Sequence, residues 1–203
     1  MFNGLEFFLG KTLLKKIDWI ESIAGHRLSL DERRQILEGD WLNDAVINAS
    51  QSLLALQFPR IKGLRDTLHY DLEPVGKTTR WDRLCSLRQQ MNKTAVVNET
   101  GRQVQAVHLP GHWVSLSNRH SEAANIVYVM DSLALNLHKD LPHIVAAVFR
   151  FSEESFSIRL RRSAQQTDGS SCGVYTVAFL TTDCYGEFLE KKDFRNKVKQ
   201  TLL

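Results

Sequence analysis

The chain has 203 residues, of which 43% are hydrophobic and 24% are charged, a composition that excludes a disordered, collagen-like or disulfide-dense protein. Its length fits one domain with a substantial core, and we predict a single domain over residues 1–203. Lys and Arg exceed Asp and Glu by only 26 to 23, which does not indicate a nucleic-acid partner. The pI of about 8.8 nevertheless permits a local basic patch.

The cysteines and the N-terminal segment indicate in which cellular compartment the protein resides. Cys85, Cys172 and Cys184 form no CxxC pair and no Cys/His ligand grid, and free thiols favour a reducing compartment. An apolar run near the start is interrupted by Glu6 and Lys11, and it lacks the features of a signal peptide. We predict an intracellular protein of the cytoplasm or nucleus, with no membrane partner, no metal and no cofactor.

Three helices are predicted in the first half, the first of them from apolar residues spaced three and four apart. The first two end at glycines, Gly25 and Gly39, which adopt the left-handed backbone that terminates helices. The third has Asn43 or Asp44 as its N-cap and ends before Pro59. The three helices span about 11–24, 31–38 and 44–58, and a weaker helical pattern covers 81–91.

The second half begins with three alternating apolar runs, which predict strands over 104–108, 113–117 and 126–130. The polar stretch between the last two is long enough for a hairpin loop, so these strands should be antiparallel neighbours. His112 precedes one of them and Asp131 follows the other, which places both residues near the same end. A helix over 137–149 and a strand over 156–160 then follow. The pattern predicts an α+β fold.

Cys172 begins an apolar run that predicts a buried helix ending near Gly186. A thiol is a weak nucleophile at its ordinary pKa of about 8.5, but a nearby imidazole or a helix N-terminus favours the thiolate. His112 can serve as the base, and the Asp131 carboxylate can orient the imidazole by accepting from one ring nitrogen. Gln166 offers an amide donor beside the Cys172 backbone N–H. Singly, such residues are more often structural; together they predict an acyl-transfer site.

Four segments, in order, resemble landmarks of the Ulp/SENP-type ubiquitin-like-protein proteases, relatives of the adenovirus protease. These segments are Trp41-Leu42-Asn43-Asp44, His112-Trp113, Asp131-Ser132-Leu133 and Gln165-Gln166-Thr167-Asp168-Gly169-Ser170-Ser171-Cys172-Gly173. The resemblance runs from about Asp40 to the C-terminus, which implies a catalytic core over 40–203 and an N-terminal helical extension over 1–39. It also implies a papain-like cysteine protease fold, with a central, mostly antiparallel sheet flanked by helices.

The resemblance implies a role for each candidate catalytic residue. Cys172 would be the nucleophile of a Cys-His-Asp triad, with His112 as general base and Asp131 as its partner. Gln166, in preference to Gln165, would donate to the oxyanion.

The implied partner is a ubiquitin-like modifier, SUMO, NEDD8 or ubiquitin, together with its conjugates. Trp41 and Trp113 would frame a narrow tunnel for the modifier's C-terminal diglycine, which only glycine could enter without a clash. Each Trp could instead be a core residue. Asp44 would help to hold the modifier, or would serve only at the helix start.

One departure from the family stands beside the nucleophile, where relatives commonly have Asp and this chain has Ser171. Without that Asp, the chain lacks a like charge that would disfavour the thiolate.

Two other functions stay open. An acyltransferase would use the same thiol but needs an acyl-CoA site, and the sequence shows no clear basic cluster for the CoA phosphates. A non-catalytic modifier-binding module is the second, although all nominated catalytic groups are present.

Overall fold

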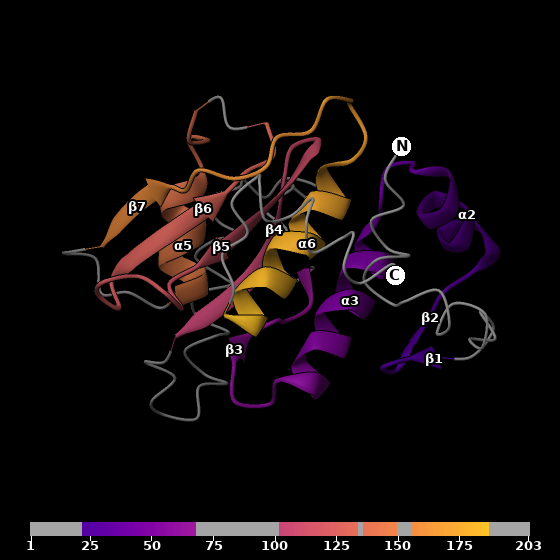
Figure 1. Cartoon of the computed structure of the whole chain (residues 1–203), viewed down its shortest axis with the longest axis horizontal. Coiled ribbons are helices and arrows are strands. Elements are labelled where there is room, and N and C mark those ends of the chain that lie inside the picture. The colour runs from indigo at the N-terminus through magenta and orange to yellow at the C-terminus, as the bar shows by residue number, and fades with distance from the viewer. Residues whose placement is uncertain (1–21, 68–101, 134–135, 150–155, 187–203) are drawn as a thin grey trace, which may run out of the picture.

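The computed structural model describes residues 22–67, 102–133, 136–149 and 156–186. A five-stranded sheet lies between helices (Figure 1), with α3 (Asp44–Gln57) and α6 (Cys172–Tyr185) on one face and α5 (Leu141–Phe149) on the other. A further helix, α2 (Leu30–Glu38), lies on the far side of α3 from the sheet. This arrangement confirms the predicted α+β class.

The strands of the sheet lie in the order β3-β4-β5-β6-β7, so neighbours in the sequence are neighbours in space. The three central strands are antiparallel, whereas the edge strands β3 and β7 run parallel to their neighbours. The bounds are β3 Lys62–Gly63, β4 Gln103–Leu109, β5 His112–Ser117, β6 Ile126–Met130 and β7 Ser157–Leu160. Gly111, with a φ of 68°, makes the tight turn between β4 and β5 and so places His112 at the start of β5.

Local contacts determine where the helices begin and end. Asn43 caps α3, because its side-chain oxygen accepts from a backbone N–H of the first turn at 3.2 Å. A capping box between Ser29 and Glu32 starts α2, which ends at Gly39 in the left-handed conformation (φ 73°). Gly186 ends α6 in the same way, with a φ of 77°. The predicted ends at Gly39 and Gly186 are therefore confirmed.

Apolar side chains fill the space on both faces of the sheet, and β4 contributes to each side. Val104 and Ala106 pack with α3 and α6, whereas Val107 and Leu109 pack with α5. Burying an aliphatic side chain of this kind stabilises the fold by about 1.5–3 kcal/mol. Because Leu180 in α6 is fully buried in the first of these clusters, α6 is held firmly against β4 and β5.

Some of the predicted elements need correction. The end of the predicted helix 11–24 is instead a small hairpin of β1 (Ser22–Ile23) and β2 (His26–Arg27). It turns at Ala24 and Gly25, whose φ angles of 51° and 89° are incompatible with a helix. The helix predicted over 31–38 begins one residue earlier, at Leu30, and its N-cap is Ser29.

The remaining predictions either differ from the structure by a few residues or concern residues that the structure does not describe. The helix predicted to start at 137 begins at Leu141. The rest of the predicted helix 11–24 and the helix predicted over 81–91 lie outside the described residues. The extents of the single domain, of the 1–39 extension and of the 40–203 core stay predictions.

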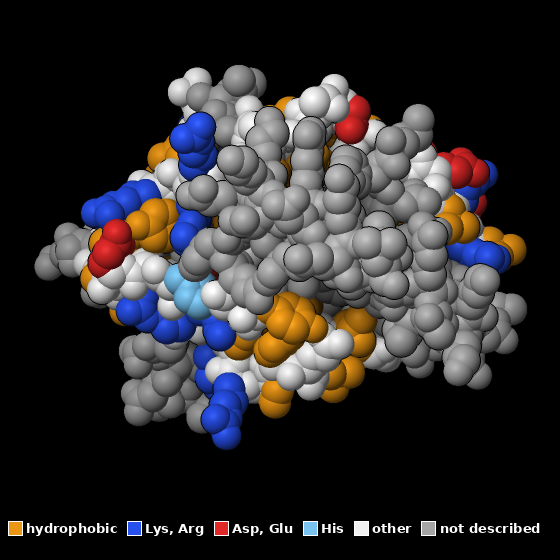
Figure 2. Space-filling model, in the orientation of Figure 1, with side chains coloured by type: hydrophobic (Ala, Val, Ile, Leu, Met, Phe, Trp, Pro, Cys, Tyr) orange, Lys and Arg blue, Asp and Glu red, His pale blue; other side chains and the backbone are white. Residues whose placement is uncertain are grey.

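The molecular surface is unevenly charged. Figure 2 shows Lys and Arg side chains gathered at the end of the molecule where β6 and β7 lie. Two of the arginines there make defined contacts: Arg159 pairs with Glu122 at 3.4 Å, and the Arg161 guanidinium lies 5.1 Å from the centroid of the Tyr128 ring. In the described part of the chain, no helix combines the length and apolar character needed to cross a membrane.

Candidate active site

Three separate elements bring Cys172, His112 and Asp131 to one end of the sheet. Cys172 is the first residue of α6, His112 is the first residue of β5, and Asp131 directly follows β6. Since β5 and β6 are antiparallel, the start of one lies beside the end of the other. Contacts between α6 and β5 then bring the helix start to the same place. The predicted placement of His112 and Asp131 at neighbouring strand ends is confirmed.

His112 and Asp131 form a direct hydrogen bond, with 2.7 Å between the imidazole Nε2 and the carboxylate Oδ1. The backbone N–H of Leu133 donates to the same oxygen at 2.7 Å, which holds the carboxylate in place. The hydrogen bond to Asp131 is the main reason that the pKa of His112 rises from 6.5 to about 9. The raised pKa favours the protonated ring at neutral pH.

The thiol of Cys172 lies against the other side of the same imidazole. The second ring nitrogen, Nδ1, is buried and makes no hydrogen bond of ordinary geometry with any described residue. The thiol is nonetheless close enough for each group to shift the pKa of the other. Burial raises the pKa of Cys172, but His112 and the backbone N–H of Trp113 outweigh it, and the net pKa is below the ordinary thiol value. The raised pKa of His112 and the lowered pKa of Cys172 both favour a thiolate–imidazolium pair.

Gln166 is buried in the loop between β7 and α6 and is held beside the end of β6. Its backbone N–H donates to the Ser132 carbonyl at 3.0 Å, and its side-chain oxygen accepts from the Ser132 hydroxyl at 2.5 Å. Its Nε2 donates to the Asp168 carbonyl at 2.7 Å. Gln165 differs, because it is exposed and donates to the Asp131 carbonyl at 3.1 Å. The Gln166 amide is therefore buried and held on both sides, and its role as oxyanion donor stays a prediction.

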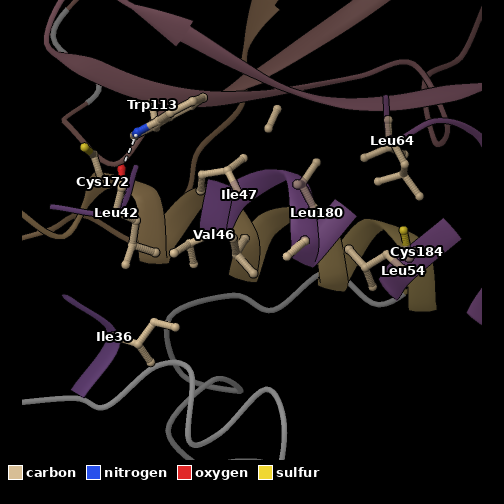
Figure 3. Packing of buried hydrophobic residues seen from close by; sticks show 14 of the residues in the cluster. Ile36, Leu42, Val46, Ile47, Leu54, Leu64, Trp113, Cys172, Leu180 and Cys184 are labelled. Atoms are coloured by element: carbon tan, nitrogen blue, oxygen red, sulfur yellow. Dashed lines mark hydrogen bonds between the residues drawn. The ribbon is translucent and has the colours of Figure 1, made fainter. Parts of the chain in front are cut away.

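The Trp41–Asp44 segment is joined to the thiol through Leu42 and Trp113. The indole N–H of Trp113 donates to the Leu42 carbonyl at 3.0 Å, and the Leu42 side chain lies against Gly173. Figure 3 shows this hydrogen bond, with Cys172 beside it, at the end of the helix pair α3 and α6. Because Asp131 of the remaining segment bonds His112, all four segments that carry the resemblance meet around the thiol.

The residues predicted to bind the modifier lie in very different environments. Trp41 is 48% exposed, whereas Trp113 is 5% exposed and belongs to the apolar cluster of α3 and α6. The Trp113 ring also packs on His108, with 4.6 Å between ring centroids. Asp44 is the first residue of α3, and the cap is its neighbour Asn43. The substrate-binding roles of all three predicted residues stay predictions.

Ser132 and Asp168 belong to the site but were not singled out from the sequence. Ser132 holds Gln166, and the Asp168 carboxylate accepts from the backbone N–H groups of Ser170 and Ser171 at 2.9 and 2.8 Å. An Asp followed by Gly and Ser is a common turn signal, since the Asp side chain bonds the backbone two residues on. That pattern could have identified Asp168 in advance.

Among the described residues, no cluster of three or more His, Cys, Asp or Glu side chains is arranged to hold a metal ion. The second described cysteine, Cys184, is buried in α6, where burial raises the pKa of its thiol to about 12. The pKa of the Cys184 thiol is thus raised, whereas that of Cys172 is lowered.

Comparison with solved structures identifies the fold of this chain. Neither a family model nor a curated protein matches the sequence. Among solved structures, the SUMO protease Ulp1 with its catalytic cysteine oxidised to a sulfinic acid matches with a TM-score of 0.62 and 15% identity over 87% of this chain and 82% of that one. The chain has the fold of the Ulp1 SUMO proteases.

Two further structures support this fold. The C-terminal Ulp1 protease domain in complex with Smt3, the yeast ortholog of SUMO, has a TM-score of 0.61 and 16% identity over 86% of this chain and 79% of that one. The Ulp1-like SUMO protease catalytic domain of Chaetomium thermophilum has a TM-score of 0.57 and 18% identity over 91% and 79%. The resemblance predicted from the four segments is thus confirmed in the fold.

Proposed function

We propose that this protein is a thiol protease that cleaves after the C-terminal diglycine of a ubiquitin-like modifier. The observation that carries the proposal is the 2.7 Å hydrogen bond between His112 Nε2 and Asp131 Oδ1, with the Cys172 thiol against the same ring. The Ulp1-type fold supports a protease that acts on such modifiers. The same site would serve both precursors and conjugates, because each presents a carbonyl group followed by an amine.

Catalysis begins with attack of the Cys172 thiolate on the carbonyl carbon of the modifier's terminal glycine. The developing oxyanion accepts hydrogen bonds from the Cys172 backbone N–H and from the Gln166 amide. His112, protonated and held by Asp131, gives its proton to the leaving amine as the C–N bond breaks. The product of this step is a thioester between the modifier and Cys172.

Hydrolysis of the thioester completes the cycle. His112, now neutral, takes a proton from water as the water oxygen attacks the thioester carbonyl. The C–S bond breaks, the modifier leaves with a free carboxylate, and the Cys172 thiolate is regenerated beside the imidazolium. Asp131 keeps the same ring orientation throughout, so one imidazole serves as the acid in the first step and as the base in the second.

A SUMO-like modifier is the first candidate substrate, because the Ulp1 domain with this fold is found in complex with Smt3. Trp41, exposed near the thiol, and Trp113 are the proposed walls for the diglycine tail. A slot between large rings admits glycine and excludes residues with side chains. NEDD8 and ubiquitin end in the same diglycine and belong in the test.

The test is hydrolysis of SUMO, NEDD8 and ubiquitin that carry a fluorogenic amide at the C-terminus. We expect one of them to be cleaved, and Cys172→Ala to abolish cleavage while still binding that modifier. Cleavage at an undiminished rate by Cys172→Ala would contradict the assignment of the nucleophile. Cleavage of none, with acetyl transfer from acetyl-CoA to Cys172, would favour an acyltransferase instead.

A further inference from the structure

Asp168 makes two kinds of contact in the loop that leads into α6. Its carboxylate Oδ1 accepts from the backbone N–H groups of Ser170 and Ser171 at 2.9 and 2.8 Å, and Oδ2 accepts from the Ser171 hydroxyl at 2.8 Å. Ser171 is the N-cap of α6, yet its side chain does not bond the helix N–H groups. The Asp168 carboxylate therefore holds the two residues that directly precede Cys172.

The backbone of Asp168 holds Gln166. The Asp168 carbonyl oxygen accepts from Gln166 Nε2 at 2.7 Å, while the Ser132 hydroxyl donates to Gln166 Oε1 at 2.5 Å. The amide plane is thus fixed from both sides. A primary amide has two N–H groups, so the one not bound by Asp168 can donate to a substrate oxygen.

We propose that Asp168 is a positioning residue for the oxyanion site. Its carbonyl orients the Gln166 amide, and its carboxylate orients the turn that presents the Cys172 backbone N–H. One residue therefore sets how the two donors lie relative to each other, which matters because such donors act only when they are aimed in advance at the developing charge. The inference rests on the proposed function, since it concerns the oxyanion of that reaction.

Ser171 is the side-chain partner of Asp168 in this turn, because the Ser171 hydroxyl donates to the Asp168 carboxylate at 2.8 Å. This hydroxyl is the main reason that the pKa of Asp168 lies below its usual range, so the carboxylate is ionised at neutral pH. A second carboxylate at position 171 would face the first at hydrogen-bonding distance and repel it. Asp168 and Ser171 are therefore a matched pair.

The matched pair predicts a rescue experiment on the modifier that the wild type cleaves fastest. Asp168→Ala and Ser171→Asp should each lower kcat by about 10- to 100-fold and change KM by less than about twofold, because donors are misaligned but the modifier surface is intact. Combining Asp168→Asn with Ser171→Asp should restore kcat to within about threefold of wild type, since the Asn amide can donate to the new carboxylate. Thr167→Ala, an exposed change in the same loop, is the control and should behave as wild type.

Alkylation of Cys172 by iodoacetamide separates positioning from general damage, because this reaction forms no oxyanion. The rate should stay within about twofold of wild type in Asp168→Ala and Thr167→Ala, since His112 favours the thiolate. The two variants with Ser171→Asp place a like charge beside the sulfur and should be alkylated more slowly, at rates similar to each other. A kcat for Asp168→Ala within about twofold of wild type would overturn the proposal. So would a double variant that is alkylated as fast as Ser171→Asp but has no higher kcat than Ser171→Asp.

The outcome is distinguishable from failure of the proposed function. If the wild type cleaves no modifier, the proposed function fails, and hydrogen exchange measured by NMR then tests the Asp168 contacts directly. The backbone N–H groups of Ser170 and Ser171 should exchange at least about tenfold faster in Asp168→Ala than in wild type. Equal exchange rates would overturn the inference.

Discussion

Gly173, the residue after Cys172, lies so close to Leu42 that a Cβ added to it would be 2.9 Å from the Leu42 Cβ. No rotation of the Leu42 side chain can move its Cβ away, so the backbone must shift. The contact therefore joins the segment Trp41–Asp44 to the start of α6, and it explains why the residue after the proposed nucleophile is glycine.

Gly173→Ala should destabilise the protein and slow its reaction with substrate. Overpacking costs about 1–3 kcal/mol, which exceeds the roughly 1 kcal/mol that Ala gains over Gly in a helix. Urea unfolding measures the loss. Gly169→Ala is the control, because nothing lies within 4 Å of a Cβ there. If both variants unfold at the same urea concentration as wild type, the contact is not tight.

Trp113→Phe should destabilise the protein more than Trp41→Phe. The first change leaves the buried Leu42 carbonyl without its 3.0 Å partner, at a cost of about 1–3 kcal/mol. The second alters a side chain that is 48% exposed and should change the free energy of unfolding by less than about 0.5 kcal/mol. Thermal unfolding compares the two, and equal losses would contradict a structural role for the Trp113 N–H.

The pH dependence of Cys172 alkylation should report the pair that it forms with His112. Because the pKa of His112 is about 9 and that of Cys172 is lowered, iodoacetamide should label Cys172 at a pH where an ordinary thiol is protonated. Asp131→Ala removes the main cause of the raised His112 pKa, so the labelling profile should move to higher pH. Cys184, with its pKa of about 12, should stay unlabelled, and peptide mass spectrometry distinguishes the two. Identical profiles for wild type and Asp131→Ala would contradict this coupling.

His112 should also make stability depend on pH. Its pKa is higher in the folded protein, about 9, than the ordinary 6.5, so folding favours the protonated ring. The resulting stabilisation is complete below about pH 6.5 and is lost as the pH rises through about 9. His112→Gln should abolish this part of the pH dependence, measured by urea unfolding across that range. If the free energy of unfolding changes equally with pH in wild type and in His112→Gln, His112 is not the source of this pH dependence.

Asp183→Asn should stabilise the protein above about pH 4. Within the described part of the chain, both carboxylate oxygens of Asp183 are buried and accept no hydrogen bond of ordinary geometry. Ser117 and nearby positive charges favour the ionised carboxylate, but burial outweighs them and raises the pKa. The unfolded chain ionises more readily than the folded one, so wild-type stability falls as the pH rises from the ordinary pKa of 3.8 through the raised value. The gain should reach about 1–3 kcal/mol at neutral pH, whereas the exposed Glu38→Gln should change little. If Asp183→Asn does not raise the free energy of unfolding measured in urea, the Asp183 carboxylate is stabilised by partners in the folded protein.

The hairpin geometry of the site was predictable because its parts have strong local signals. Alternation over 113–117 and 126–130 predicted the strands, and the polar stretch between them predicted the hairpin that brings His112 beside Asp131. The long apolar run after Cys172 likewise predicted α6. The link between Leu42 and Trp113, 71 residues apart, carries no such signal, because it depends on how α3 packs on the sheet.

The parts that escaped prediction are short or depend on side-chain contacts across the chain. The two-residue strand β3 is too short for any period to appear, and its position depends on Gly63, whose φ is 85° and whose Cα lies against Val104. The apolar spacing near Ile23 predicted a helix, although the turn at Ala24 and Gly25 made a hairpin. The hydrogen bond between Ser132 and Gln166 forms only because the end of β6 lies beside the loop before α6. That proximity depends on tertiary packing and leaves no local signal in the sequence.

The most direct test of the proposed function is covalent capture by SUMO, NEDD8 and ubiquitin probes that carry an electrophile in place of the C-terminal carboxylate. We expect a stable adduct with at least one probe, located on the Cys172 peptide by mass spectrometry. Cys172→Ala should form no adduct, and His112→Gln should form it far more slowly. Absence of any adduct with all three probes, from a folded protein whose Cys172 reacts with iodoacetamide, would contradict the proposed function.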